Sequence, residues 1–451
     1  MRQPRRAPIL LAYAAFVLVG VNAGVNGVLL AAQMDDYAVS RATLGLTFFA
    51  GSAGFVLAGV TAGALIHRFG TRLAVAIGGC VYVSAALYAG TRPAFVAFVL
   101  LQIASGYGVG VLESVLNAYL SALPHPTTLL NRLHGFFGVG ALLGPPLAAR
   151  IVAVASWPTV MLLLGAAAVP LTAGFLIAYP RAESDPAATV PAGSKPTGSD
   201  PAGSDPAGSD PAGSDPAGSD PTGSDPTGSD PTAVKPEPPA PDGGLAGLAV
   251  RQSGVLLGAA LLTVYVGLEL GVGNWAYAYL VQARGQAEAL AGYAVSGYWL
   301  GLTAGRFLLG PIVTRLGLTA AGLMRTCLTG VTLVAALTWL LPGRAAAAAG
   351  LALLGFFLGP VFPTAMALAP RLTTTRLVPA AIGIMNAGSV VGGSLLPWLA
   401  GAIAGRAGVW TLLPFTLALS LLQHGIWWPM ARRVGACPES PPRTAGSGAR
   451  T

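Results

Sequence analysis

The sequence predicts an all-α membrane protein with twelve transmembrane helices in two halves of six. Of its 451 residues, 54% are hydrophobic and only 9% are charged, whereas soluble proteins carry about 25% charged residues. The apolar residues gather in runs of about 20 or more, the length that a helix needs to cross a bilayer. This composition argues against a soluble enzyme or a nucleic-acid-binding protein, because neither could cover its surface with so little charge.

The first six apolar runs precede a long polar interruption. The N-terminal run follows a basic segment, as in a signal peptide, but it continues to about Ala32 without a convincing small-residue cleavage site. We therefore interpret it as an uncleaved first span. The predicted spans of this half are residues 9–32, 43–66, 73–91, 94–120, 133–155 and 159–179.

The polar interruption is a low-complexity segment. Residues 191–230 are eight consecutive pentapeptides of the form P-A/T-G-S-D/K. Proline and glycine oppose regular structure, and the repeats contain nothing that could form a core. The sequence therefore predicts a disordered linker. The predicted organisation is an N-terminal half (1–180), the linker (181–244), a C-terminal half (245–430) and a tail (431–451).

The second six apolar runs repeat features of the first. Residues 63–70 match residues 310–317, and Gly106 and Gly110 match Gly355 and Gly359. A tandem repeat of two six-helix halves is typical of secondary transporters, whose substrate site lies between the halves. The predicted spans of this half are residues 252–280, 290–313, 320–341, 345–369, 378–403 and 409–430.

The basic residues predict the orientation. With the N-terminus inside, 18 lysines and arginines fall on inner loops and tails and 6 on outer loops. Cytoplasmic loops carry such an excess. We therefore expect a multi-pass protein of the cell (inner) membrane, with both termini and the linker in the cytoplasm.

The segment G63-A-L-I-H-R-F-G-T-R72 resembles the signature loop between helices two and three of the major facilitator superfamily, usually G-x-L-a-D-R-x-G-R-R, with His67 in place of the acid. Further segments resemble the fucose/galactose/glucose–proton symporter branch of that superfamily, namely 131–145, 265–280, 298–306 and 355–364. The resemblance implies alternating access. The predicted gate residues are Gly63, His67, Arg68, Gly70, Arg72, Arg306 and Arg315.

Two acids lie inside predicted spans, Glu113 and Glu269. An ionisable group there costs at least ~2.5 kcal/mol, so each is a candidate functional residue. Glu113 shares a polar helix face with Gln102 and Asn117, and E113-S-V-L-N117 resembles the branch pattern in which this glutamate binds substrate and takes the proton. The alternative is a carboxylate that only bonds to a neighbouring helix. For Glu269, the alternatives of substrate contact, with a share in proton coupling, and helix packing stay open.

The branch also carries an acid late in its first helix, and this chain has Asn22 and Asn26 there instead. Amides bind hydroxyl groups but hold no proton, which argues against a two-carboxylate relay of the family's kind. Each amide could instead join two helices, each tryptophan could anchor at the membrane interface, and Arg306 could snorkel. The predicted substrate-binding residues are Asn22, Asn26, Gln102, Glu113, Asn117, Glu269, Asn274, Trp275, Trp299 and Asn386.

This amide-rich, charge-poor set predicts proton-coupled uptake of a sugar or similar neutral polar solute. The alternative is a drug or metabolite exporter, because the segment from Gly140 to Pro145 partly resembles the G-x-x-x-G-P stretch of superfamily antiporters. A membrane enzyme would need clustered Asp, His or Cys, which the spans lack. We expect a monomer whose partners are a small-molecule substrate, protons and the lipid bilayer, with no cofactor, no metal and no nucleic acid.

Overall fold

The computed structural model describes residues 6–124, 126–179, 247–315, 317 and 319–436. The predicted linker and residues 437–451 of the predicted tail lie outside these ranges. The other part of that tail, 431–436, is helical and continues the last span.

The first half of the chain forms six helical elements. Their bounds are α1 (Arg6–Tyr37), α2 (Arg41–Leu44), α3 (Leu46–Ala89), α4 (Phe95–Ser121), α5 (Pro126–Val154) and α6 (Trp157–Ala178). The second half contains more short elements. Their bounds are α8 (Ser253–Ala278), the π-helical turn η2 (Tyr279–Ala283), α9 (Glu288–Arg315), α10 (Ala320–Leu340), α11 (Arg344–Leu358), α12 (Val361–Ala367), the 3₁₀ turns η3 (Ala369–Arg371) and η4 (Thr375–Leu377), α13 (Val378–Ala407), the 3₁₀ turn η5 (Val409–Thr411) and α14 (Leu412–Ala436).

The described helices make twelve crossings, which confirms the predicted fold class. Ten helical segments are long and apolar enough to span a membrane. One of them, 41–89, contains two crossings that meet at Gly70, where φ is 73° and ψ is 164°. Glycine adopts this conformation without a steric penalty. The 28-residue α9 supplies the remaining crossing.

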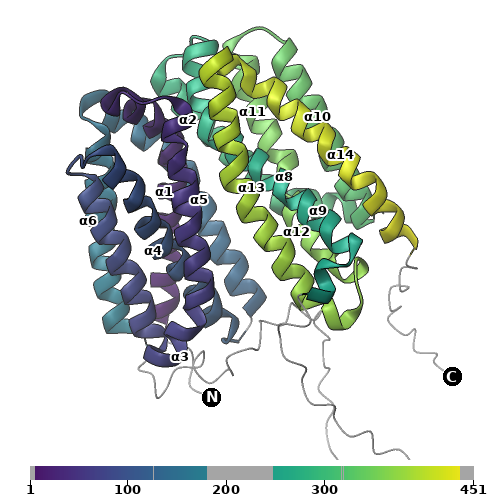
Figure 1. The fold of residues 1–451 in the computed structure, drawn as a ribbon, viewed down its shortest axis with the longest axis horizontal. Coiled ribbons are helices and arrows are strands. Elements are labelled where there is room, and N and C mark those ends of the chain that lie inside the picture. Colours follow the sequence, from purple (N-terminus) through teal and green to yellow (C-terminus); the bar gives the residue numbers. More distant parts are fainter. Residues whose placement is uncertain (1–5, 125, 180–246, 316, 318, 437–451) are drawn as a thin grey trace, which may run out of the picture.

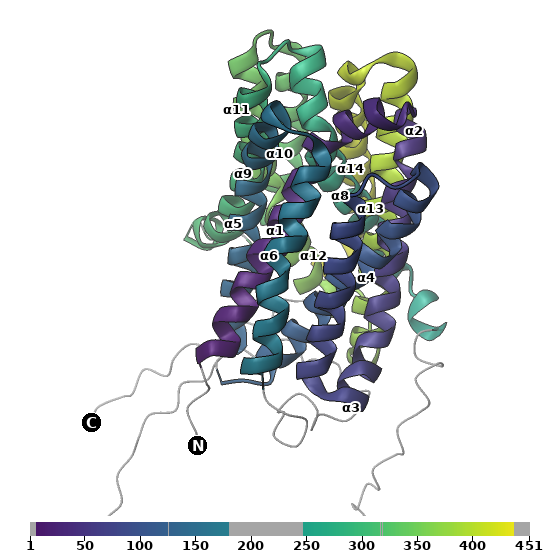
Figure 2. The ribbon, with the colours of Figure 1, turned by 90° about the vertical axis from the view of Figure 1, so that its left-hand side faces the viewer.

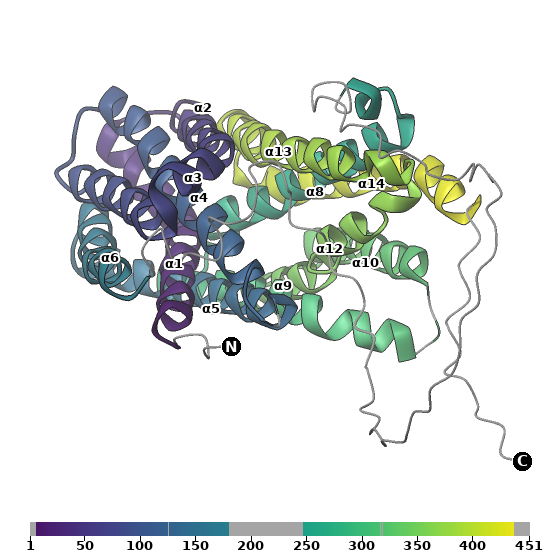
Figure 3. The ribbon, with the colours of Figure 1, turned by 90° about the horizontal axis from the view of Figure 1, so that it is seen from below.

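The crossings gather into two groups, α1–α6 and α8–α14, which lie side by side in Figure 1 and one in front of the other in Figure 2. The start of α1 and the turn of α3 at Gly70 lie at one end of the bundle, and α2 lies at the other end. Seen from below, α5 and α9 run next to each other at the junction of the two groups (Figure 3). Their close approach uses small residues, because a side chain at Gly138 would collide with Thr303.

The repeated glycines have the same packing role in both halves. On α4, a side chain at Gly106 would overlap the backbone of Gly51 on α3. On α11, a side chain at Gly355 would overlap the backbone of Tyr298 on α9. Small residues let helix backbones approach closely inside a membrane. The repeat in the sequence therefore marks one helix-packing geometry that is used twice.

Candidate transport site

A cavity of about 660 Å³ lies between the two halves. Its wall is formed mainly by α1, α3 and α4 of the first half and by α8, α9 and α13 of the second. Nine of the ten predicted substrate-binding residues line it. They are Asn22, Asn26, Gln102, Glu113, Asn117, Glu269, Asn274, Trp299 and Asn386.

Glu113 faces this cavity from α4 and is half-buried. Within the described ranges, no side chain or backbone group bonds to its carboxylate. The nearby Asn117 amide is already used, because its Nδ2 donates to the backbone oxygen of Glu113 at 2.8 Å. Glu113 is therefore a carboxylate at the edge of a large cavity, without a partner among the described residues.

The polar residues of α1 lie on the same wall. Tyr82 donates its hydroxyl to Oδ1 of Asn22 at 3.1 Å, which fixes the amide and leaves its NH₂ group to donate. Asn26 is exposed to the cavity one helical turn further along. Gln102 of α4 makes one long contact, from Nε2 to the oxygen of Phe98 at 3.5 Å. These amides are placed to bond to a polar solute. Tyr82 was missed by the sequence reasoning, since an isolated tyrosine in an apolar run carries no distinguishing signal.

Glu269 faces the cavity from α8, but it has a partner. Arg306 Nη2 lies 3.3 Å from Glu269 Oε1, and Arg306 Nε donates to the backbone oxygen of Gly359 at 3.3 Å. The Tyr298 hydroxyl donates to the backbone oxygen of Glu269 at 2.8 Å. Arg306 is thus held inside the second half by an ion pair, which corrects the snorkelling alternative for this residue.

The second half adds two rings, Trp299 and Phe362, and two amides to the wall. Trp299 is only 4% exposed, and its indole packs over Gly273, where a Cβ would collide with it. Asn274 Nδ2 donates to the oxygen of Leu270 at 2.9 Å. Asn386 is exposed on α13. The second half therefore offers fewer free polar groups than the first.

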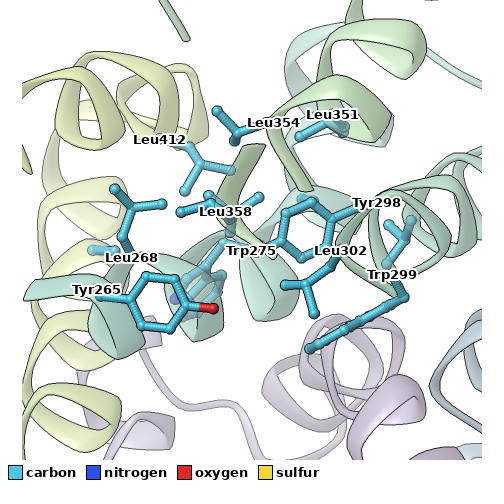
Figure 4. Close-up of a cluster of buried hydrophobic side chains, with 14 of the residues drawn as sticks. Tyr265, Leu268, Trp275, Tyr298, Trp299, Leu302, Leu351, Leu354, Leu358 and Leu412 are labelled. Atoms are coloured by element: carbon cyan, nitrogen blue, oxygen red, sulfur yellow. The ribbon is translucent and has the colours of Figure 1, made fainter. Parts of the chain in front are cut away.

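Trp275 lies outside the cavity, which corrects its place in the predicted substrate set. It is 2% exposed, and its Nε1 donates to the backbone oxygen of Pro397 at 2.8 Å. Figure 4 shows it inside the apolar core of the second half, beside Leu358 and Leu268. The physical reason is helical phase, because Asn274 and Trp275 are neighbours in sequence and point to different sides of α8.

Three contacts close the α2 end of the bundle. This is the outer end in the orientation predicted from the basic residues, so we call them the outer latch. Arg41 Nη2 donates to Gln282 Oε1 at 2.7 Å, and Trp398 Nε1 donates to the backbone oxygen of Ala42 at 3.0 Å. The rings of Phe49 and Trp398 lie 5.8 Å apart. Each contact joins the first half to the second. The sequence reasoning missed all of these residues, which looked like ordinary polar and interfacial groups at span ends.

The predicted loop residues lie at the opposite end. Gly63, His67 and Arg68 are exposed near the turn of α3, and Arg68 stacks over the Phe69 ring at 5.3 Å. Gly70 supplies the turn, and Arg72 is half-buried just beyond it. In the second half, Arg315 is exposed at the end of α9. Arg306 is separate from this set and lies beside Glu269.

Comparisons with known proteins give one family. The model of the Major Facilitator Superfamily matches residues 11–272. The chain is 25% identical over 409 residues to "Bypass of stop codon protein 6" of Saccharomyces cerevisiae, covering 87% of this chain and 76% of that protein.

Three solved structures show the same fold. A bacterial homologue of the human lysosomal transporter Spinster aligns with a TM-score of 0.71 and 12% identity, over 98% of this chain and 100% of that one. A D-xylose–proton symporter aligns with a TM-score of 0.68 and 12% identity, over 96% and 99%. The nucleoside transporter NupG aligns with a TM-score of 0.71 and 10% identity, over 94% and 99%. With its twelve crossings and its cavity between two halves, the chain belongs to the major facilitator superfamily and is a membrane transporter rather than an enzyme.

Proposed function

We propose that this transporter couples the uptake of a neutral polar solute, such as a sugar, to protons by alternating access. The observation that carries the proposal is the Glu113 carboxylate, which faces the cavity and has no bonded partner in the part of the chain that the structure describes. A carboxylate in a low-dielectric site is stabilised by taking up a proton or by gaining a polar ligand. Glu113 is therefore the proposed proton site.

The charge of the cavity wall supports a neutral solute. Among the described residues, those that line the cavity include Glu113 and Glu269 but no lysine or arginine. Arg306 compensates Glu269 from behind the wall. Once Glu113 takes up a proton, the wall is electrically balanced, and a solute with hydroxyl groups can bond to the amides of Asn22 and Asn26. Apolar rings such as Trp299 can cover the less polar face of a sugar.

Proton binding then assists the conformational change. Moving an ionised carboxylate through a closed, water-poor state is costly, and a protonated one avoids that cost. Proton and solute therefore favour each other by linkage. The outer latch closes the α2 end, and the cavity reaches Asn117, about one turn from the other end of α4. We propose that both termini are cytoplasmic in the cell membrane. The structure, with its α2 end closed, is then the inward-open state. We also propose that the monomer is the working unit.

The exporter alternative has a weaker physical basis. Its sequence signal rests on Gly140 and Gly144. Both glycines pack against α1, where a side chain would collide with the backbone of Val17, Val21 or Gly24. Helix packing thus accounts for both glycines without a role in export. The direction of transport is decided by the assay below.

Substrate-induced thermal stabilisation tests the proposal, because a ligand that binds the folded state raises the melting temperature by mass action. The panel contains sugars, polyols, nucleosides and cationic drugs. We expect stabilisation by a neutral polyhydroxylated solute. Asn26→Ala should raise the dissociation constant of that solute roughly tenfold, as for the loss of one or two hydrogen bonds. Gln252→Ala, an exposed amide outside the cavity, is the matched control.

The same solute is then tested in vesicles. An imposed inward proton gradient should drive its accumulation, and a protonophore should abolish it. Stabilisation by cationic drugs alone, or accumulation driven by an outward rather than an inward proton gradient, would replace uptake by export.

A further inference from the structure

We infer that Arg306 is a positioning residue that keeps Glu269 ionised and fixed, so that Glu113 alone exchanges the proton. Both acids face the same cavity, and only one has a cationic partner. The inference has two parts. The number of protons carried per cycle rests on the proposed function. The ionised state of Glu269 does not rest on that function, and it can be tested without any substrate.

The geometry holds Arg306 in one place. Its Nη2 lies 3.3 Å from Glu269 Oε1, and its Nε donates to the oxygen of Gly359 at the junction of α11 and α12. The side chain of Glu269 is 12% exposed and that of Arg306 is 32% exposed. The pair is thus shielded from bulk water, where its attraction would be weak. Arg306 joins α9 to both α8 and α11.

The other groups around the pair do not supply a second cation to Glu269. The hydroxyls of Tyr265 and Tyr298 lie beside it, and both tyrosines are fully buried. Tyr298 bonds to the backbone oxygen of Glu269 rather than to its carboxylate. From the first half, His134 on α5 lies within electrostatic reach of Arg306. The ionised form of Glu269 therefore depends on Arg306.

Removing the guanidinium should change the chemistry of Glu269. A carboxylate that loses its only cation in a poorly solvated site takes up a proton, because the neutral form needs no partner charge. The cavity would then hold two exchangeable protons, on Glu113 and on Glu269. In the native protein, Arg306 confines this exchange to one carboxyl group. Coupling of one proton to each solute follows from that arrangement.

Infrared difference spectroscopy of the purified protein in lipid discs tests the inference, because a protonated carboxyl group has its own C=O band. At about pH 6, ordinary exposed carboxylates are ionised and do not contribute. We expect the native protein to show one such band on acidification, lost in Glu113→Gln and unchanged in Glu269→Gln. Arg306→Met should gain a second band, which the double variant Glu269→Gln/Arg306→Met should lack. Arg306→Lys, which keeps a charge, should resemble the native protein, as should Arg325→Met, which removes an exposed arginine of α10.

Two results would overturn the inference. One is a native band that weakens in Glu269→Gln, which would mean that Glu269 already holds the proton. This result needs no Arg306 variant and stands even if Arg306→Met fails to fold. The other is a folded Arg306→Met protein without a second band. A native spectrum with no band that depends on Glu113 would instead remove the proposed proton site and leave the ionised state of Glu269 intact.

Discussion

The two walls of the cavity each contribute one glutamate, and the glutamates differ in their partners. Glu113, on the wall of the first half, has no bonded partner among the described residues, and the adjacent Asn117 amide is occupied by the helix backbone. Glu269, on the wall of the second half, is paired with Arg306 and lies under the Tyr298 hydroxyl. An acid inside a membrane span is thus not by itself a proton site. We propose that its neighbours decide whether it exchanges a proton or stays a fixed charge.

The largest expected effect comes from Glu113→Gln. Glutamine keeps the size of the side chain but cannot ionise. We expect this variant to lose uphill accumulation entirely while folding normally and retaining exchange of solute across the membrane. Vesicle uptake under a proton gradient, measured beside counterflow at equal pH, separates the two activities. Accumulation at the native level would mean that another group carries the proton. The two walls would then not differ in proton coupling as proposed.

The second effect concerns the paired wall. Removing one partner of a buried ion pair usually costs ~3–5 kcal/mol, and the partial exposure of Arg306 reduces this to about 2 kcal/mol. Arg306→Met should therefore lower the melting temperature by several degrees. The double variant Glu269→Gln/Arg306→Met, which also removes the carboxyl group that has lost its partner, should recover part of the loss. If the two variants melt together, Glu269 without its partner does not destabilise the folded protein.

A third effect lies outside the cavity, at the outer latch. Trp398→Ala removes one hydrogen bond and one ring contact, worth together roughly 1.5 kcal/mol, so the population of the state that is open at the α2 end should rise about tenfold. Gln282→Ala loses one exposed hydrogen bond and should give about a twofold rise. Spin labels at Thr91 and Ala287, both exposed at that end, report the distance between the halves. The proton dependence of transport should not change in either variant, since neither touches Glu113.

A fourth effect concerns the turn of α3. His67 stands where the family signature has an acid, and it is exposed beside Arg68. We expect His67→Asp to change the rate of reorientation by a few-fold and to leave solute affinity within about twofold, because the residue lies outside the cavity. Turnover and equilibrium binding are measured on the same preparation. A large change in the dissociation constant at constant turnover would contradict this role.

The smallest effect is predicted for the linker. Repeats that form no core contribute no folding energy, so deleting 191–230 should leave uptake within about twofold. The shortened connector would still span tens of ångströms as a coil. A variant that reaches the membrane folded and transports nothing would show that the linker does more than join the halves.

Much of the fold follows from composition and hydrophobic runs. The lengths of the apolar runs gave the twelve crossings, and the repeat of Gly106 and Gly355 marked equivalent helix contacts in the two halves. Glu113 could be placed in the cavity because a polar helix face inside a membrane must point into the bundle. These features are local, and local sequence specifies them.

The partners of the site residues depend on tertiary packing, which the sequence does not encode at short range. Glu269 and Arg306 are 37 positions apart, so their contact follows from how α8 packs against α9. Trp275 and Trp299 looked equivalent as rings near the site, yet only Trp299 lines the cavity. Trp398 had no predicted role, and its contact with Ala42 exists only because the two halves meet there.

Proton uptake on solute binding is the most direct test of the central claim, which is that Glu113 carries the coupled proton and Glu269 does not. The solute identified by thermal stabilisation is added to purified protein in weakly buffered solution at a pH at which Glu113 is ionised, and the pH change is recorded. We predict uptake of up to one proton per bound solute for the native protein and for Glu269→Gln, and none for Glu113→Gln. Uptake that persists in Glu113→Gln, or that disappears in Glu269→Gln, would contradict the account.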